Sequence, residues 1–183
     1  MIDRPAAIRR AVRTVVARKG FHGASMSDVA REAGVAVGTA YVHYPSKEEL
    51  LFATYLEVKR ELGAAATARV DSDRPAEERF VQLWCGVYEH LADDPDRAAF
   101  LVQFDASPWA AEGHERAMQV ADDPLVAEAA RPDLAGRLVD LPPLVLYDLA
   151  LGPAVRAAAS REPLDPARQA ILARACWRAV TDG

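Results

Sequence analysis

The sequence predicts an all-α protein, and three observations point to that class. Along most of its 183 residues, apolar side chains recur every three or four positions, as they do on one face of a helix. Residues that cap helices stand where these stretches begin, and glycine or proline stands where they end. No convincing run shows the strict alternation that marks a half-buried strand. Helices joined by short breaks are therefore expected along the whole chain.

The first 45 residues predict three helices. Apolar residues interleaved with arginines form a first helix that ends at Gly20, because glycine readily takes the backbone conformation that closes a helix. Ser25 is a good N-cap for a short second helix, which Gly34 ends. A third short helix is expected over residues 37–44, since Pro45 then breaks the chain.

The remaining elements are expected to be helices of very different lengths. Ser46 and Glu49 form a capping box that opens a long helix reaching about Val70. The clearest amphipathic pattern in the chain covers residues 80–91. Further helices are expected over residues 96–106, 143–160 and 165–180, whereas prolines and glycines divide residues 107–141 into short helices and loops.

Composition excludes several classes of protein. With 51% hydrophobic and 27% charged residues, the chain is not wholly disordered. No apolar run approaches the ~18 residues of a membrane-spanning helix, and arginines interrupt the N-terminal apolar stretch where a secretory signal would stand. Cys85 and Cys176 are expected to be reduced core residues that form no disulfide. These features predict a cytoplasmic protein with no membrane partner.

Charge is distributed unevenly between the two ends of the chain. Residues 1–60 contain ten Lys and Arg against six Asp and Glu, whereas the rest contains twelve against twenty-one. A basic N-terminal segment on an acidic body favours a polyanionic partner at that segment alone.

The most informative stretch, residues 25–47, reads SMSDVAREAGVAVGTAYVHYPSK. It predicts a helix, a tight turn at Gly34 and a second short helix, an arrangement that places the second helix in the major groove of DNA. Hydroxyl, phenol, imidazole and ammonium groups on or beside that helix are common phosphate contacts. The candidate DNA-binding residues are Ser25, Ser27, Val37, Gly38, Thr39, Tyr41, His43 and Lys47.

Some of these residues also have a purely structural interpretation. Ser25 caps a helix whether or not it touches DNA, and Tyr41 or His43 could pack inward, although Tyr44 already supplies an inward aromatic ring. Lys47 stands in the first turn of a helix, where a positive charge is unfavourable, so that a phosphate partner would explain it.

This stretch resembles the DNA-binding domain of the TetR/AcrR family of bacterial transcriptional regulators, over about residues 8–55. The matching positions are Asp28, Ala30, Ala33, Gly34, Val35, Gly38, Thr39, Tyr41, His43, Ser46, Lys47, Glu48 and Leu50. The resemblance implies a helix-turn-helix DNA-binding domain over residues 1–47 and a helical regulatory and dimerisation domain over residues 48–183. It also implies a homodimeric repressor that a small molecule releases from a pseudo-palindromic operator on double-stranded DNA.

The sequence departs from the family pattern at the start of the recognition helix. Ala36 replaces the usual serine, so that the helix lacks a side-chain cap, which costs ~1 kcal/mol. Val37 replaces a residue that is often polar and cannot hydrogen-bond a base edge. It could contact a thymine methyl group instead.

The C-terminal part contains candidate ligand-binding and dimer-interface residues. Aromatic residues along residues 80–109 are either core or the wall of a pocket for a largely apolar effector, and Asp105 is either a surface residue or a partner for a cationic or hydroxylated ligand. The ligand-binding candidates are Trp84, Tyr88, Phe100, Phe104, Asp105 and Trp109. The candidate dimer interface, on the last two helices, consists of Leu144, Val145, Leu149, Val155, Ile171, Leu172, Ala175 and Val180.

Two other functions remain open from the sequence. One is a DNA-binding regulator whose C-terminal domain only dimerises or binds a protein, which a solid core near Trp84 and Phe104 would favour. The other is a helical small-molecule enzyme, although no nucleophile elbow, zinc-protease, phosphate-loop or dinucleotide motif is present. No cofactor, catalytic residue or metal site is expected.

Overall fold

The computed structural model describes residues 3–120, 123–160 and 162–182, and it confirms the all-α class. Every regular element in those residues is a helix, and the only β-type pairing among them is an isolated bridge between Leu138 and Thr181. The helices are α1 (Arg4–Gly23), α2 (Met26–Glu32), α3 (Val37–His43), α4 (Lys47–Thr67), α5 (Ala76–Ala92), α6 (Pro95–Asp105), α7 (Ala110–Met118), α8 (Pro124–Ala129), α9 (Pro132–Ala135), α10 (Pro143–Ala150), α11 (Gly152–Ala159) and α12 (Pro166–Val180).

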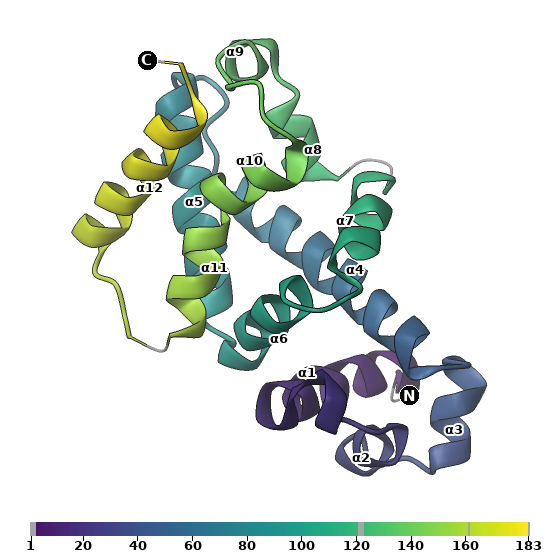
Figure 1. Ribbon diagram of the computed structural model, residues 1–183. Coiled ribbons are helices and arrows are strands. Elements are labelled where there is room, and N and C mark those ends of the chain that lie inside the picture. Colours follow the sequence, from purple (N-terminus) through teal and green to yellow (C-terminus); the bar gives the residue numbers. More distant parts are fainter. Residues whose placement is uncertain (1–2, 121–122, 161, 183) are drawn as a thin grey trace.

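Helices α1 to α3 form an N-terminal head at one end of the molecule (Figure 1). The head is held together by apolar residues of α1, including Ile8 and Val12, which are fully buried with Val29 of α2 and Ala40 of α3. The predicted break at Gly20 is present, because this glycine leaves the helical conformation with φ +71° inside α1. One further turn then carries Phe21 inward.

Helix α4 connects the head to the body. In Figure 1 it runs from the head diagonally into the larger group of helices. Its buried face continues along its length, from Leu51 through Val58 to Ala66. Near its C-terminal end α4 lies so close to α5 that a Cβ atom on Gly86 would stand 3.0 Å from the Ala66 backbone, so that only glycine allows this crossing.

Helix α5 is the centre of the body, with α4, α11 and α12 packed around it. The expectation of one helix over residues 143–160 is wrong, because α10 ends at Ala150 and α11 begins at Gly152. Pro153 explains the break, since proline has no N–H to donate and its ring clashes with the carbonyl of the preceding turn. The expected helices over 165–180 and 80–91 are present as α12 and α5, and residues 107–141 form the short helices α7, α8 and α9.

A buried arginine fastens the short helices α8 and α9 to α5. The Arg79 side chain is 2% exposed; its Nε donates to Glu128 (2.7 Å), and its two terminal nitrogens donate to Asp133 (2.8 and 3.0 Å). These charged hydrogen bonds hold the pKa of Asp133 below its usual value. This guanidinium group ties both helices to α5, in addition to the packing of α8 on α4 and the buried side chain of Leu134.

The free cysteines agree with the sequence prediction: Cys85 is half-buried, Cys176 is buried, and neither is disulfide-bonded. Within the described residues, no helix combines the length and apolarity needed to cross a membrane.

Candidate nucleic-acid interface and regulatory cavity

Helices α2 and α3 form a helix-turn-helix with the predicted caps and turn. The Ser25 hydroxyl accepts the N–H of Asp28 (3.1 Å) at the start of α2. Gly34 takes φ +67°, a conformation that side chains disfavour, and the Val35 N–H then donates to the Ala30 carbonyl (2.9 Å). The turn therefore brings α3 across α2 at a fixed angle.

The Asp28 carboxylate stabilises the start of this motif. It accepts hydrogen bonds from Lys19 (2.8 Å), Ser25 (2.8 Å) and Arg31 (2.6 Å). These three donors, Lys19 foremost, hold the pKa of Asp28 well below its usual range. Asp28 is therefore ionised whenever the motif is folded near neutral pH.

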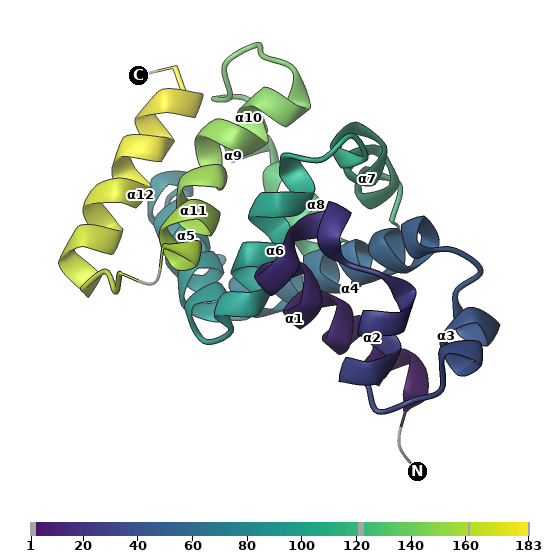
Figure 2. The same cartoon turned by 60° about the horizontal axis from the view of Figure 1, so that its bottom comes forward.

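One face of α3 is open to solvent, and both ribbon views place this helix at the outer end of the molecule (Figures 1 and 2). Tyr41 is 51% exposed, and neither its hydroxyl nor the His43 ring has a hydrogen-bond partner among the described residues. The inward alternative for these two side chains therefore does not hold, and Tyr44 is the buried aromatic ring instead. Of the other candidates, Ser25, Ser27, Val37 and Gly38 are exposed and Thr39 is half-buried.

The sequence interpretation missed Val42, which is 81% exposed near the C-terminal end of α3. Together with the exposed Val37 and Tyr41 it gives this short helix a group of exposed apolar side chains, which is a signal of a contact outside the chain. As expected, Ala36 at the start of α3 provides no side-chain cap.

Lys47 differs from its expected role. Its Nζ donates to the backbone carbonyls of Phe21 (2.6 Å) and Ala24 (3.0 Å). These oxygens, at the end of α1, explain a positive charge at the start of α4 without a phosphate. Lys47 fastens the start of α4 to the end of α1.

Two arginines of α1 are likewise used within the chain. Arg9 pairs with Glu57 (2.7 Å) and Arg13 lies 3.6 Å from Glu61, so that both tie α1 to α4. Arg4 and Arg10, by contrast, are exposed.

The aromatic residues proposed to line a ligand pocket are core residues instead. Trp84, Tyr88, Phe100 and Phe104 are buried, and the Phe104 ring stacks on Tyr55 with 4.0 Å between the ring centres. The rings pack edge to face or stack on one another, and Trp84, Phe100 and Phe104 border neither of the two hollows described below, whereas Tyr88 lines the smaller one. The half-buried Trp109 packs on Phe21 (6.0 Å), and Asp105 lies 3.1 Å from His114.

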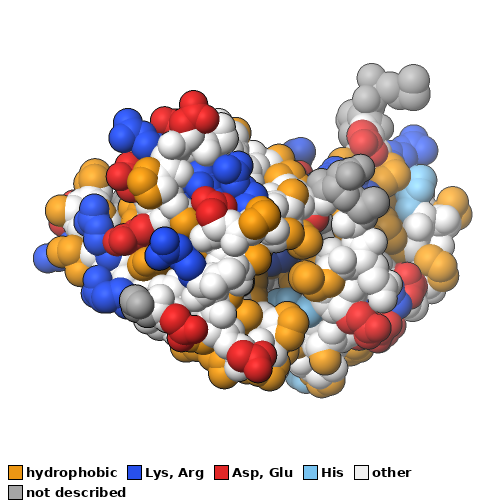
Figure 3. Space-filling model, turned by 90° about the horizontal axis from the view of Figure 1, so that it is seen from above, with side chains coloured by type: hydrophobic (Ala, Val, Ile, Leu, Met, Phe, Trp, Pro, Cys, Tyr) orange, Lys and Arg blue, Asp and Glu red, His pale blue; other side chains and the backbone are white. Residues whose placement is uncertain are grey.

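A cavity of about 520 Å³ lies beside this aromatic core, between α4, α5, α7, α8 and α10. Its wall is mostly apolar, and none of the six predicted ligand-binding residues lines it. Figure 3 shows the molecule from above, and on this face hydrophobic side chains border a hollow. The wall includes Lys59, Phe80, Leu83, His114, Leu125, Leu134, Leu138, Leu146 and Tyr147.

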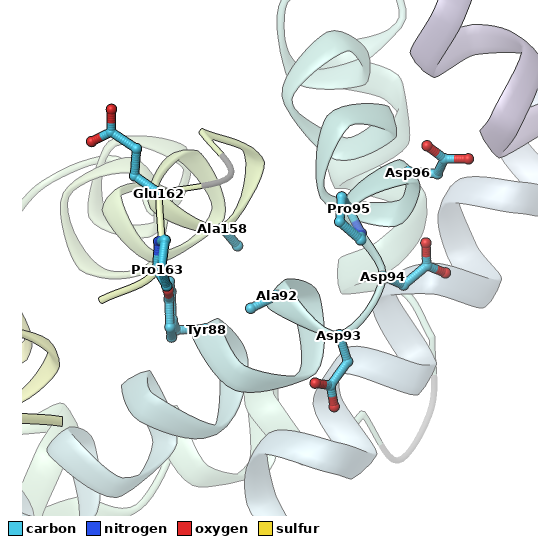
Figure 4. A pocket seen from close by; sticks show the side chains of 9 residues that line it. All are labelled: Tyr88, Ala92, Asp93, Asp94, Pro95, Asp96, Ala158, Glu162 and Pro163. Atoms are coloured by element: carbon cyan, nitrogen blue, oxygen red, sulfur yellow. The ribbon is translucent and has the colours of Figure 1, made fainter. Parts of the chain in front are cut away.

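A second hollow of about 490 Å³ lies where α5 turns into α6. Four acidic residues line it, and Figure 4 shows Glu162 across the hollow from Asp93, Asp94 and Asp96. Asp94 caps α6 by accepting the Arg97 N–H (3.2 Å), and the Tyr88 hydroxyl accepts the Leu164 N–H (2.7 Å). Asp94 and Tyr88 thus already have partners within the chain. We therefore regard this hollow as a surface depression with an acidic rim.

The predicted dimer interface is partly exposed and partly core. Leu144, Val145 and Leu149 on α10 are exposed, and Ile171 on α12 is 64% exposed. Ala175 is also exposed, and Leu172 is half-buried. Val155 and Val180 do not belong to this surface, because both are buried within the chain. The break before α11 turns Val155 toward α5 and α6, while Val180 contributes to the cavity wall.

The fold and this outward helix define a class of protein: a DNA-binding transcriptional regulator with an N-terminal helix-turn-helix and a helical C-terminal body. Residues 8–54 match the family described as "Bacterial regulatory proteins, tetR family", and residues 75–181 match "Tetracyclin repressor-like, C-terminal domain". The chain belongs to the TetR family of transcriptional regulators.

Relatives of known sequence and structure agree along nearly the whole chain. An HTH-type transcriptional regulator of Haemophilus influenzae is 26% identical over 171 residues, which cover 91% of this chain and 89% of the relative. A TetR-family regulator from Shewanella sp. PV-4 superposes with a TM-score of 0.82 at 27% identity and full coverage of both chains. FadR from Bacillus subtilis, solved in complex with stearoyl-CoA, shares the fold at 17% identity, with a TM-score of 0.71 over 97% of this chain and 98% of its own.

Proposed function

We propose that this chain is a homodimeric repressor that a small molecule, bound in the body, releases from a pseudo-palindromic operator. The observation that supports this best is the pairing of an outward recognition helix with an apolar cavity in the same chain. Two-fold symmetry would place two copies of α3 in successive major grooves of the DNA. A repressor of this kind would act in the cytoplasm. The exposed apolar residues of α10 and α12 are the proposed dimer surface.

The outward face of α3 divides into two kinds of DNA contact. Tyr41 and His43 offer polar groups without internal partners, which suit phosphate oxygens. Val37 and Val42 are apolar and exposed, and they suit thymine methyl groups. Ser25, Ser27 and Thr39 supply hydroxyl groups around them.

Gly38 supports the same proposal by a different argument. A Cβ atom at this position would have no neighbour within 4 Å, and no unusual backbone conformation requires a glycine there. Glycine inside a helix costs about 0.5–1 kcal/mol relative to alanine, so the fold gains nothing from it. A close approach by the DNA backbone accounts for the missing side chain.

Contacts between the body and the head offer a path from the cavity to DNA. Helix α6 packs along α1, and Gln103 Nε2 donates to the Val16 carbonyl (3.0 Å). The Phe21 ring lies edge-on to Phe104 (6.1 Å), which in turn contacts Gly113 of the cavity-lining helix α7. A ligand that moves α7 therefore moves groups that touch the head. A hundredfold change in operator affinity needs ~2.7 kcal/mol of coupling, which lies within the ordinary range.

A regulator without a ligand is the second candidate, and the solid aromatic core around Trp84 and Phe104 favours it. The cavity beside that core argues for a ligand, because about 520 Å³ is within the usual range for small-molecule sites. FadR of Bacillus subtilis, with its bound stearoyl-CoA, shows that this fold can hold a ligand with an apolar chain.

The first test is selection of genomic DNA fragments on the purified full chain at two salt concentrations. An enriched pseudo-palindrome that survives the higher salt supports specific dimeric binding, whereas sequence-independent binding that salt removes contradicts it. Gly38→Ala provides the matched variant. It should fold at least as stably as the wild type while it binds the selected operator more weakly. Unchanged operator affinity in this variant would contradict the placement of α3 against DNA.

A further inference from the structure

Lys59 is a buried cation in the wall of the apolar cavity. It lies on α4, is 7% exposed, and points its Nζ over the Tyr147 ring of α10, 3.9 Å from the ring centre. Within residues 3–120, 123–160 and 162–182 it has neither a hydrogen bond nor an ion pair. The other two lysines of the chain both reach oxygen atoms: Lys19 bonds Asp28 and Lys47 bonds two carbonyls.

A second polar group beside Lys59 also lacks a partner. The Tyr147 hydroxyl is buried and makes no hydrogen bond within the described part of the chain. A buried charge is costly unless it is paired, and a buried hydroxyl is costly unless it is hydrogen-bonded. The aromatic ring offsets part of the lysine's cost through its π-face, but it offers no oxygen acceptor. Lys59 Nζ thus faces the cavity without an oxygen acceptor, and the hydroxyl of the ring beneath it is buried without one.

The other charged groups of the wall are already occupied or face solvent. The Asp123 carboxylate accepts the N–H groups of Leu125 (2.8 Å) and Val126 (3.3 Å), and Glu115 is exposed. The His114 ring lies between the Tyr55 hydroxyl and Asp105, each 3.1 Å away. Lys59 is therefore the only lysine or arginine among the described residues of the wall.

Most of the remaining wall is apolar and suits an apolar group. It is formed largely by the leucines 83, 125, 134, 138 and 146. A ligand that matches both the Lys59 end and the leucine wall of the cavity carries an anionic acceptor at one end and an aliphatic or aromatic body at the other.

We propose that the effector of this regulator is an amphipathic carboxylate. Its carboxylate would accept a hydrogen bond from Lys59 Nζ and, once a shift of the Tyr147 ring opens its buried hydroxyl to the cavity, a second from that hydroxyl. Its apolar tail would lie among the leucines. The inference rests on the proposed ligand-controlled function and adds the chemical class of the ligand and the two residues that select it.

Titration of the full chain with decanoate and with decan-1-ol, both below their aggregation concentrations, tests the proposal by calorimetry. The two probes share a tail and differ in charge. Decanoate should bind more tightly, and Lys59→Met should weaken its binding about 30-fold or more, since a desolvated charge pair is lost. The affinity of decan-1-ol should change little in that variant. Tyr147→Phe, which keeps the ring, should weaken decanoate binding by a smaller factor.

The control is Arg60→Met, which removes an exposed positive charge from the next position of α4 and should leave both affinities unchanged. Melting temperatures show whether each variant is folded, and the comparison of the two probes on the wild type needs no variant. Equal binding of the two probes, binding of neither, or decanoate affinity unchanged in folded Lys59→Met would each overturn the inference. The proposed function has a separate readout: if decan-1-ol releases the operator and decanoate does not, ligand control stands and the carboxylate is wrong.

Discussion

Arg79 should be the most sensitive single position for the stability of the cavity wall. Arg79→Met removes the guanidinium that joins α5 to Glu128 and Asp133 and leaves the Glu128 side chain, 14% exposed, without its closest partner. Breaking a buried pair from one side costs about 3–5 kcal/mol. Because Asp133 is half exposed and water can replace its partner, the lower end applies, about 3 kcal/mol. In a chain of this length the melting temperature should then fall by roughly 6–12 °C.

Urea unfolding followed by circular dichroism, at one fixed protein concentration, measures this loss. Arg74→Met is the matched control, because Arg74 is largely exposed and its pairs with Asp71 and Glu78 should be worth about 1 kcal/mol or less. Adding Glu128→Gln to Arg79→Met should restore part of the stability, since the stranded charge is removed. A loss below about 1 kcal/mol in Arg79→Met, or no recovery in the double variant, would refute the reasoning.

Three further predictions follow from contacts in the head and core. Lys47→Met should lower the free energy of unfolding by about 1.5–3 kcal/mol and leave the salt dependence of operator binding unchanged. A weaker salt dependence at unchanged stability would instead show that Lys47 contacts a DNA phosphate. Gly113→Ala should destabilise the chain by about 1–3 kcal/mol in thermal melts, because its Cβ would stand 2.3 Å from the Phe104 ring; a neutral result would mean that the ring moves freely. Asp28 has a lowered pKa, so its contribution is fully present above the unfolded value of ~3.9 and is lost as the pH falls from there through the lower pKa of the folded state. The stability gap between wild type and Asp28→Asn, measured by urea unfolding, should therefore shrink below about pH 4, and a gap that widens there would contradict the assignment.

The head could be predicted almost completely because its signals are local. Gly20 and Gly34 act through their own backbone conformation, and each serine cap accepts an N–H only three residues away, so that a single sequence identifies them. The role of Lys47 could not be predicted, since its two carbonyl partners come from a turn that only the folded head brings near.

In the body, the sequence predicts most of the helices but not which side of each helix faces the core, the cavity or solvent. An aromatic residue fits a core and a pocket equally well, and only packing decides that Phe104 stacks on Tyr55 while Leu83 borders empty space. Most of the cavity wall comes from residues 111–151, where prolines and glycines obscure the periodicity. Val155 lies in the core and not on the predicted surface because the helix breaks before Pro153, and a continuous apolar pattern does not reveal that break.

The ring of Phe21 bears on how such regulators can be recombined. It belongs to the head by sequence, yet it packs edge-on against Phe100, Phe104 and Trp109 of the body. A chimera that joins this head to a foreign body at residue 47 would lose three aromatic neighbours and expose an apolar ring. A graft that carries the matching aromatic residues of α6 along with the head would keep them. The unit that can be exchanged between regulators is thus a set of contacts that crosses the chain's apparent domain boundary.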